Sequence, residues 1–484
     1  MKKYKLLYIL PAALLFGCEP EFEDVDFNGG SADFSSYVSV GNSLTAGYQN
    51  NALKRDKQEA SISAMLAGQF REVGGGEFKQ PLMDPGVGLG SSLNAEFGLY
   101  ILPGCNPDNP PGPTPQPIAA QGQLDQLNPA NFVGSDGPFN NVGVPGAKSF
   151  HLLAPGYGNI AGLAADPRTA NPFYVRFCNS TNSQETVVEA AMRASPTFFS
   201  LWIGNNDVLG YSTTGGEEGD DMITPTAMFS GAYKQTLAAL TSNGAEGVIA
   251  NIPYVTSIPY FTTVPNGTDA ITEGQAAQLN AGYAAYNAGL DQVASSPNSP
   301  LTQAEADRRK ISFEAGNFNT FVVLDPNLTD LTSINPALVN MRQSTLEELM
   351  VLVTPGDSLS CFGMGTATPI PGKYHINAVE LDKIKTAIDE YNVVIKNEAE
   401  TRGLAFVDAN ARLQELASSG IAIDGINFNS DFIAGGAFSL DGVHPSTRGY
   451  AIIANDFIAA INAKYGANVP SVVVSSYPAF EVVQ

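Results

Sequence analysis

Short apolar segments recur along the chain, and stretches with helical periodicity lie between them. The segments at 37–40, 140–142, 197–203, 247–252 and 405–407 are apolar and rich in β-branched or aromatic residues, as buried strands are. Before the last of them, apolar side chains recur at steps of three and four residues from Leu381 to Ile395, and Gly403 follows as the expected helix end. A final helix is predicted from Ser446 to about Tyr465. This alternation predicts an α/β fold in which helices cover a parallel sheet.

Long stretches between these elements fit no compact strand–helix unit and are interpreted as insertions. They comprise residues 50–139, 151–185 and 260–375, within one expected domain at 35–468 that is followed by a C-terminal tail at 469–484. The Pro- and Gly-rich run at 103–117 is expected to be a loop held by contacts, since chain of the same sheet resumes after it. Insertions at strand ends usually build the substrate pocket, so we expect them to decide specificity.

The N-terminus has the features of an export signal. Three lysines precede the apolar stretch 6–16, and Gly17 and Cys18 follow it. Residues 15–18, LFGC, resemble the bacterial lipobox, although Phe16 departs from its usual small or β-branched residue; a plain secretory signal with an incidental cysteine is the alternative. The resemblance implies a signal peptide at 1–17, lipidation of Cys18, an acidic tether at 18–34, and anchoring in the bacterial cell envelope, at the outer membrane.

The net charge and the cysteine content limit which binding partners and which kinds of site the protein is expected to have. The net charge is −23, and removal of the three signal lysines leaves 22 basic against 48 acidic residues, a net charge of −26. Such a charge opposes binding to nucleic acid or to an anionic lipid surface, so the lipid anchor has to provide membrane attachment. Cys105, Cys178 and Cys361 remain after lipidation, which suggests one disulfide and one buried thiol, with three pairings open. Their wide spacing, with only three histidines in the chain, disfavours a metal site.

Candidate chemistry begins at residues 37–47, YVSVGNSLTAG. An apolar strand runs into a turn flanked by Gly41, and a helix of small residues follows. This geometry can expose the hydroxyl of Ser43 beside a helix N-terminus, whose backbone N–H groups favour developing negative charge. Taken alone, the segment is equally an ordinary serine in a strand-to-helix turn.

Three further blocks follow in order, the first two at the ends of expected strands. They are residues 141–146 (NVGVPG), 202–207 (WIGNND) and 441–445 (DGVHP). With the first block they resemble the SGNH (GDSL-like) hydrolase family, whose blocks read approximately GDSL, N-x-x-x-x-G, G-x-N-D and D-x-x-H-P. The match spans residues from about 37 to 465, although only the blocks are specific.

The resemblance implies a fold and a set of residue roles. The fold is a three-layer α/β/α arrangement with a parallel, flavodoxin-like sheet and long loop insertions. Ser43 is the expected nucleophile, His444 the general base and Asp441 the residue that orients it. The backbone N–H groups of Ser43 and Gly146 and the side-chain amide of Asn206 form the expected oxyanion hole. No metal or other cofactor is implied.

General chemistry agrees with these roles. A serine hydroxyl needs a neighbouring base, and an imidazole titrates near neutral pH. Asp441 precedes His444 by three residues in a turn, so one loop can supply both the base and the carboxylate that fixes its tautomer. Asn205 is a rival to Asn206, but the register of the third block favours Asn206.

One departure and one competing motif bear on the assignment. Asn42 stands where the family's first block usually has Asp; this residue does not take part in the triad, so the change affects local hydrogen bonding only. A literal GDSL occurs at 356–359 and contains Ser358, but no oxyanion block lies between it and Asp441, and Pro355 interrupts its approach from the preceding apolar segment. The order of the blocks favours Ser43.

These observations predict a carboxylic-ester hydrolase that acts through a serine acyl-enzyme. The resemblance implies that the substrate is an ester of a lipid or of an acylated carbohydrate, and neither the acyl length nor the oligomeric state follows from the sequence. Acyl transfer at the same site, or a non-catalytic surface lipoprotein that binds a partner, are the alternatives. His151 and His375 have structural interpretations, His375 as a partly buried residue that opens a helix. Trp202 is expected in the core or lining an acyl or sugar pocket.

Overall fold

The computed structural model describes residues 26–86, 88–90, 96–105, 112–118, 123–179, 184–216 and 221–478. The expected signal peptide, Cys18 and the first part of the expected tether lie outside the described residues. Within the described ranges, no helix combines the length and apolar character that crossing a membrane requires.

A parallel sheet forms the centre of the described structure. Its strands are β1 (Tyr37–Gly41), β4 (Asn141–Gly143), β5 (Phe198–Trp202), β6 (Glu246–Ala250) and β13 (Ala405–Val407). Their spatial order is β4-β1-β5-β6-β13, with every neighbouring pair parallel. All the segments predicted as strands belong to this sheet, so the predicted α/β class with a parallel sheet is confirmed. The order is the flavodoxin-like one, in which the chain changes direction across the sheet between β1 and β5.

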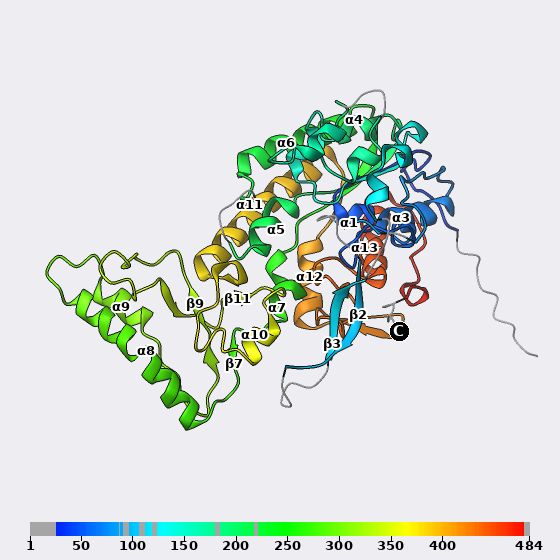
Figure 1. Ribbon diagram of the computed structural model, residues 1–484. Coiled ribbons are helices and arrows are strands. Elements are labelled where there is room, and N and C mark those ends of the chain that lie inside the picture. Colours follow the sequence, from blue (N-terminus) through cyan, green and yellow to red (C-terminus); the bar gives the residue numbers. More distant parts are fainter. Residues whose placement is uncertain are drawn as a thin grey trace, which may run out of the picture.

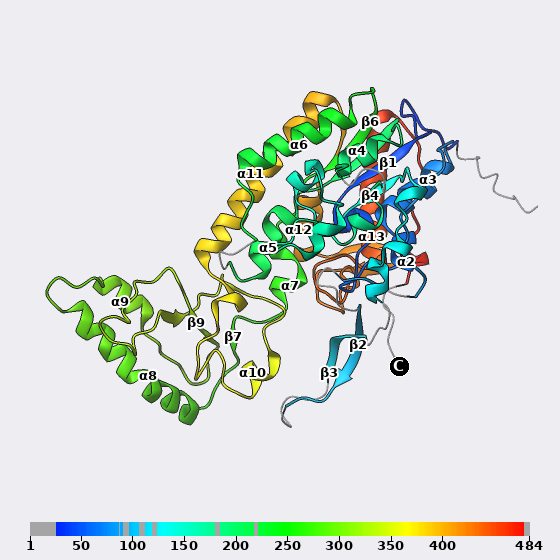
Figure 2. The same ribbon diagram turned by 45° about the horizontal axis from the view of Figure 1, so that its top comes forward.

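Helices cover both faces of this sheet (Figure 1, Figure 2). On one side lie α3 (Ile62–Arg71) and α13 (Thr447–Tyr465), and on the other lie α4 (Val187–Met192), α6 (Thr226–Leu240) and α11 (Ala378–Arg402). The apolar faces of these helices and the strands between them form the main hydrophobic core. This layering fixes the carboxyl ends of the strands as one edge, from which the loops of the candidate site emerge.

Capping residues mark the start or end of the two helices predicted from periodicity. The side chain of Asn377 accepts a hydrogen bond from the Glu380 N–H at 3.1 Å and begins α11, while Gly403, with φ of 66°, ends it. Ser446 begins α13 by accepting a hydrogen bond from the Gly449 N–H at 3.1 Å. The predicted end at Gly403 and start at Ser446 are therefore confirmed.

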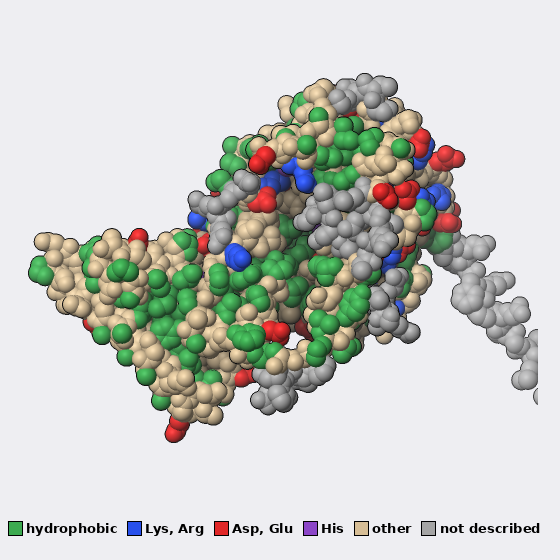
Figure 3. All heavy atoms as spheres, viewed as in Figure 1, with side chains coloured by type: hydrophobic (Ala, Val, Ile, Leu, Met, Phe, Trp, Pro, Cys, Tyr) green, Lys and Arg blue, Asp and Glu red, His purple; other side chains and the backbone are tan. Residues whose placement is uncertain are grey.

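Most of residues 260–375 form an arm that projects from the sheet body (Figure 1), while Tyr260, Phe261 and Val351 are buried in the main core. Its helices α8 (Glu273–Ala294) and α9 (Gln303–Arg309) enclose a separate hydrophobic cluster. Tyr283, Tyr286 and Leu290 lie three and four residues apart, so one face of α8 is apolar and buried. The expected loop insertion therefore contains regular structure with a core of its own. On the face shown in Figure 3, the arm carries many apolar and few charged side chains.

The first insertion also contains regular structure. Residues 103–117, expected to be a loop, include strand β3 (Gly112–Pro117), which pairs antiparallel with β2 (Phe97–Leu102). Cys105 beside this hairpin forms a disulfide with Cys361 of the arm, and Cys178 is a buried free thiol. The structure thus selects one of the three pairings that the sequence left open.

Both ends of the described chain pack on the domain. Ser31 N–H donates to the carbonyl of Tyr465 at 2.9 Å, and Phe34 is buried, so the expected tether joins the folded body before residue 34. Val469, Val472 and Val474 are buried in the main core, so the first part of the expected tail is folded as well.

The remaining elements are short. The helices are α1 (Ser43–Ala46), α2 (Arg55–Glu59), α5 (Asn206–Thr213), α7 (Pro259–Thr262), α10 (Gly356–Ser360) and α12 (Ala409–Ser418). The strands are β7 (Gly267–Thr268), β8 (Asn319–Thr320), β9 (Val322–Leu324), β10 (Met341–Gln343), β11 (Leu349–Met350), β12 (His375–Ile376), β14 (Ile421–Ile423) and β15 (Ile426–Phe428). The 3-10 turns are η1 (Gln123–Leu127), η2 (Pro129–Asn131), η3 (Gly134–Asp136), η4 (Ser149–Leu153), η5 (Ile160–Ala164), η6 (Tyr174–Arg176), η7 (Val255–Ser257), η8 (Gly372–Tyr374) and η9 (Val474–Ser476).

Candidate active site

Ser43 lies where β1 ends and α1 begins. The preceding residue, Asn42, is the N-cap of α1, and its side-chain oxygen accepts a hydrogen bond from the backbone N–H two residues on, at 3.0 Å. A side chain at Gly41 would lie 2.2 Å from Oγ1 of Thr45, so only glycine permits so close a turn. Local sequence therefore builds the turn that carries the Ser43 hydroxyl.

The imidazole of His444 bridges Ser43 and Asp441. Its Nε2 lies 2.9 Å from Ser43 Oγ, and its Nδ1 lies 2.9 Å from Asp441 Oδ2. Ser43 and His444 are 401 residues apart in the chain, so only the tertiary fold can bring them together. The ring of Tyr48 packs against the imidazole, with centroids 4.7 Å apart. This geometry allows a proton to pass from the hydroxyl to the imidazole.

The carboxylate of Asp441 is largely buried, and both of its oxygens have hydrogen-bond partners. Oδ1 accepts hydrogen bonds from the backbone N–H groups of Val443 and His444 at 2.9 and 2.8 Å. Burial by itself opposes ionisation, but the charge of His444 and the hydrogen bonds lower the pKa of Asp441 to about 2. Asp441 is therefore ionised at neutral pH. Its Oδ2 accepts a hydrogen bond from the Nδ1–H of His444, which leaves Nε2 free to act as a base toward Ser43.

Two asparagines that the sequence did not single out support the Asp441 loop. Asn50 and Asn51 have φ of 53° and 65°, in the left-handed region that asparagine tolerates better than most residues. The Asn51 N–H donates to Asp441 Oδ2 at 2.9 Å, and Asn50 Oδ1 accepts from the Leu440 N–H at 3.0 Å. A pair of asparagines is a turn signal in the sequence. It does not reveal a supported loop 390 residues away.

The expected oxyanion residues come from three neighbouring strand ends. Asn206 is the first residue of α5, after β5, and its Nδ2 donates to the carbonyl of Ala147 at 2.9 Å. Ala147 follows Gly146, which has φ of 79° and lies exposed in the turn after β4. Ser43 lies after β1, between these two strands in the sheet. The structure therefore joins Asn206 to the turn of Gly146 at the edge that carries Ser43.

The neighbours of Asn206 have structural partners. Asn205 Oδ1 accepts a long hydrogen bond, 3.5 Å, from Asn42 Nδ2. Asp207 is fully buried, and its two oxygens accept hydrogen bonds from the Ser149 N–H at 2.8 Å and hydroxyl at 2.7 Å. Burial raises the pKa of Asp207, although the Ser149 hydrogen bonds oppose that shift. Asp207 thereby ties the third block to the segment that follows the second.

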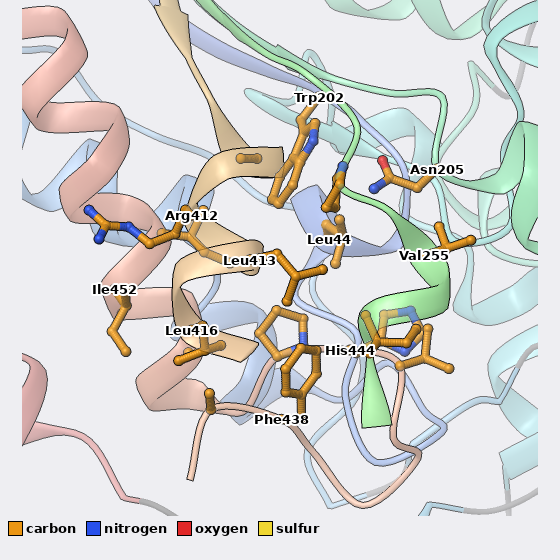
Figure 4. Close-up of a pocket in the computed structure, with 18 of the residues that line it drawn as sticks. Leu44, Trp202, Asn205, Val255, Arg412, Leu413, Leu416, Phe438, His444 and Ile452 are labelled. Atoms are coloured by element: carbon orange, nitrogen blue, oxygen red, sulfur yellow. The ribbon is translucent and has the colours of Figure 1, made fainter. Parts of the chain in front are cut away.

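An apolar cavity begins at these side chains (Figure 4). Ser43, Asn206 and His444 line it, and its volume is about 110 Å³. Apolar side chains form most of the remaining wall, among them Leu44, Val255, Leu413, Leu416 and Phe438. Trp202 belongs to the main core and also lines the cavity, while its Nε1 donates to the carbonyl of Asn251 at 3.0 Å. The site is therefore a polar catalytic edge beside an apolar space.

The competing serine and the other histidines lie away from this site. Ser358 lies in α10 of the arm. His151 Nδ1 accepts a hydrogen bond from the Lys148 N–H at 3.1 Å. His375 Nε2 lies 3.1 Å from an oxygen of buried Glu348. The structure thus brings His444, and neither of the other histidines, to Ser43.

The expectation that His375 opens a helix is wrong. His375 lies in β12, paired with Met350 of β11, and is 1% exposed. Helix α11 begins after Asn377 because the short asparagine side chain reaches the N–H of the first helical turn, as an N-cap must.

Comparisons of this chain with protein-family models, with curated proteins and with solved structures found no match. In the part of the chain that the structure describes, no group of three or more His, Cys, Asp or Glu side chains is arranged to hold a metal ion. The interpretation of the site therefore depends on its own geometry.

Proposed function

We propose that this protein is a serine ester hydrolase of the SGNH (GDSL-like) type, which cleaves carboxylic esters through an acyl-enzyme. The observation that carries the proposal is the chain of hydrogen bonds from Ser43 through His444 to Asp441, each 2.9 Å long. The flavodoxin-like strand order and the meeting of four sequence blocks at one sheet edge support it further.

The proposed reaction uses these residues in two stages. Ser43 Oγ attacks the ester carbonyl while Nε2 of His444 takes the hydroxyl proton. Amide donors at Ser43, Gly146 and Asn206 stabilise the oxyanion. The ester C–O bond then breaks, and His444 gives its proton to the departing alcohol. In the second stage His444 takes a proton from water, which attacks the acyl-enzyme, and returns it to Ser43 as the carboxylic acid leaves.

A short-chain fluorophosphonate and p-nitrophenyl butyrate test this proposal together. The probe should label Ser43 in the wild-type protein, and Ser43→Ala should abolish both labelling and ester cleavage. His444→Ala should reduce both steeply, because the hydroxyl loses its base. Ser358→Ala is the matched control and should behave as wild type. Labelling that survives Ser43→Ala but disappears in Ser358→Ala would show that the other serine reacts, and no cleavage or labelling in any protein would overturn the hydrolase proposal.

We also propose that the protein is attached to the bacterial outer membrane through a lipid on Cys18. The apolar stretch that ends at Gly17 and Cys18 supports this proposal. The mature protein should partition with membranes, and Cys18→Ser should release it. A soluble wild-type protein that begins at Glu19 or later would contradict the anchor.

A further inference from the structure

We infer that the cavity beside Ser43 is a channel for the acyl chain of the substrate, which selects straight, medium-length fatty acyl esters over acetyl esters. The inference rests on the proposed function and deepens it, because it names the acyl group that the same site accepts. It follows from three features: the faces of two helices, the connection to Ser43, and the ion pair at the far end.

Two helices present matching faces to the cavity. On α12, residues 409, 412, 413 and 416 line it, and on α13, residues 449, 452, 453 and 456 do so. Both sets have the spacing of a single helix face. The cavity therefore extends from the catalytic residues into the space between α12 and α13.

The catalytic residues lie at one end of this space. In Figure 4, Leu413 lies between Trp202 and Phe438 at the centre, with His444 on one side and Arg412 on the other. An acyl group on Ser43 Oγ, with its carbonyl oxygen toward Asn206, has its remaining substituent directed to neighbouring space. The apolar wall makes this space favourable for methylene groups and unfavourable for sugar hydroxyls, which would lose their hydrogen bonds to water.

An ion pair lines the cavity at the end opposite His444, where the Arg412 side chain is partly exposed to solvent. Arg412 Nε lies 3.1 and 2.9 Å from the two carboxylate oxygens of Asp456, and Nη2 lies 2.5 Å from one of them. Nη1 donates to Glu415 at 2.6 Å. Two carboxylates thus already engage the guanidinium, so a chain that reached it would have to displace a charge-assisted pair. This pair sets an upper limit on chain length.

The expected substrate profile follows from these walls. Each methylene that enters the channel should raise kcat/KM about fourfold, the factor expected for burying one CH₂ group. With p-nitrophenyl acetate, butyrate, octanoate and palmitate, kcat/KM should therefore rise from acetate to octanoate and fall at palmitate. A wild-type protein that prefers acetate would overturn the inference.

Substitutions of residues that line the cavity test whether it holds the acyl chain. Leu413→Trp fills its centre and should lower the octanoate-to-acetate ratio of kcat/KM by at least about tenfold, equivalent to losing two buried methylenes. Leu381→Trp, at a partly buried position of α11 outside the cavity, is the matched control and should keep the wild-type ratio. The double variant Arg412→Met with Asp456→Met replaces the ion pair by apolar side chains and should raise the palmitate-to-octanoate ratio.

Two readouts separate this inference from the proposed function. A short-chain fluorophosphonate reports whether Ser43 is still reactive in each variant, and thermal unfolding reports whether the variant is folded. If Leu413→Trp is labelled like wild type but its octanoate-to-acetate ratio is unchanged, the channel assignment is wrong while the hydrolase proposal stands. If Leu413→Trp does not fold, the double variant decides in the same way. If wild type cleaves no ester and is not labelled, the proposed function fails and the channel fails with it.

Discussion

Replacing Asp441 by asparagine should nearly abolish catalysis while leaving the shape of the site intact. Oδ1 of the carboxylate accepts hydrogen bonds from two backbone N–H groups. Oδ2 accepts a hydrogen bond from the Asn51 N–H and lies opposite Nδ1 of His444. An amide can accept hydrogen bonds at only one of these atoms. With its oxygen at the Oδ1 position, its NH₂ group faces His444. The imidazole must then accept at Nδ1 and carry its proton on Nε2, where it cannot take the proton of Ser43.

The expected losses of activity and stability follow from the contacts that the substitution removes. The wrong imidazole tautomer should lower kcat by about 10⁴-fold, as for other triads in which the aspartate becomes asparagine. The Asn51 N–H loses its buried acceptor, which should lower the free energy of unfolding by about 1–3 kcal/mol. Acid stability should change as well. The pKa of Asp441 is lowered from 3.8 to about 2. Above pH 3.8 the ionised carboxylate therefore contributes about 2 kcal/mol to the free energy of unfolding, and this contribution is lost as the pH falls toward 2. Asp441→Asn should lack this acid-dependent loss.

Initial rates with p-nitrophenyl butyrate, together with urea unfolding at neutral and acid pH, measure these effects. Asp382→Asn, at an exposed position of α11, makes the same chemical change away from the site and is the matched control. Should Asp441→Asn keep more than about a tenth of the wild-type kcat, the argument from the tautomer of His444 would be refuted.

Three further predictions concern other residues. Asn206→Ala should lower kcat about 10²- to 10³-fold through loss of an oxyanion donor, and Asn205→Ala should have a smaller effect; equal losses in initial rate would contradict the assignment. Burial raises the pKa of the Cys178 thiol to about 11, so iodoacetamide should modify it only after unfolding, and mass spectrometry that finds native Cys178 alkylated would disprove its burial. Burial opposes ionisation of Glu348, but hydrogen bonds from His375 and an arginine lower its pKa from 4.5 to about 2. Its contribution to the free energy of unfolding, about 3 kcal/mol, should be present above pH 4.5 and lost as the pH falls toward 2. The stability of Glu348→Gln, measured by urea unfolding, should depend less on acid pH than that of the wild type. An unchanged dependence would show that Glu348 is not the source of the acid sensitivity.

The sequence by itself determined the features that depend on local interactions. Runs of β-branched and aromatic residues indicated the five strands, because these side chains favour an extended backbone. Capping residues such as Gly403 and Ser446 indicated helix ends, because their hydrogen bonds lie within a few residues. The turn at Gly41 and Asn42, and the loop that holds both Asp441 and His444, are local for the same reason. Block order then favoured Ser43 over Ser358.

Only the tertiary structure decided which distant segments meet. Nothing near Cys105 specifies Cys361 as its partner, and nothing near Asn51 specifies the carboxylate of Asp441, because each contact joins residues hundreds of positions apart. The arm does not follow from the sequence, because the sequence does not show what its apolar helix faces pack against. The cavity exists because two helix faces, each with ordinary core spacing, lie far enough apart to leave space between them. Periodicity identifies an apolar face, but only the packed structure determines whether that face meets another side chain or a substrate.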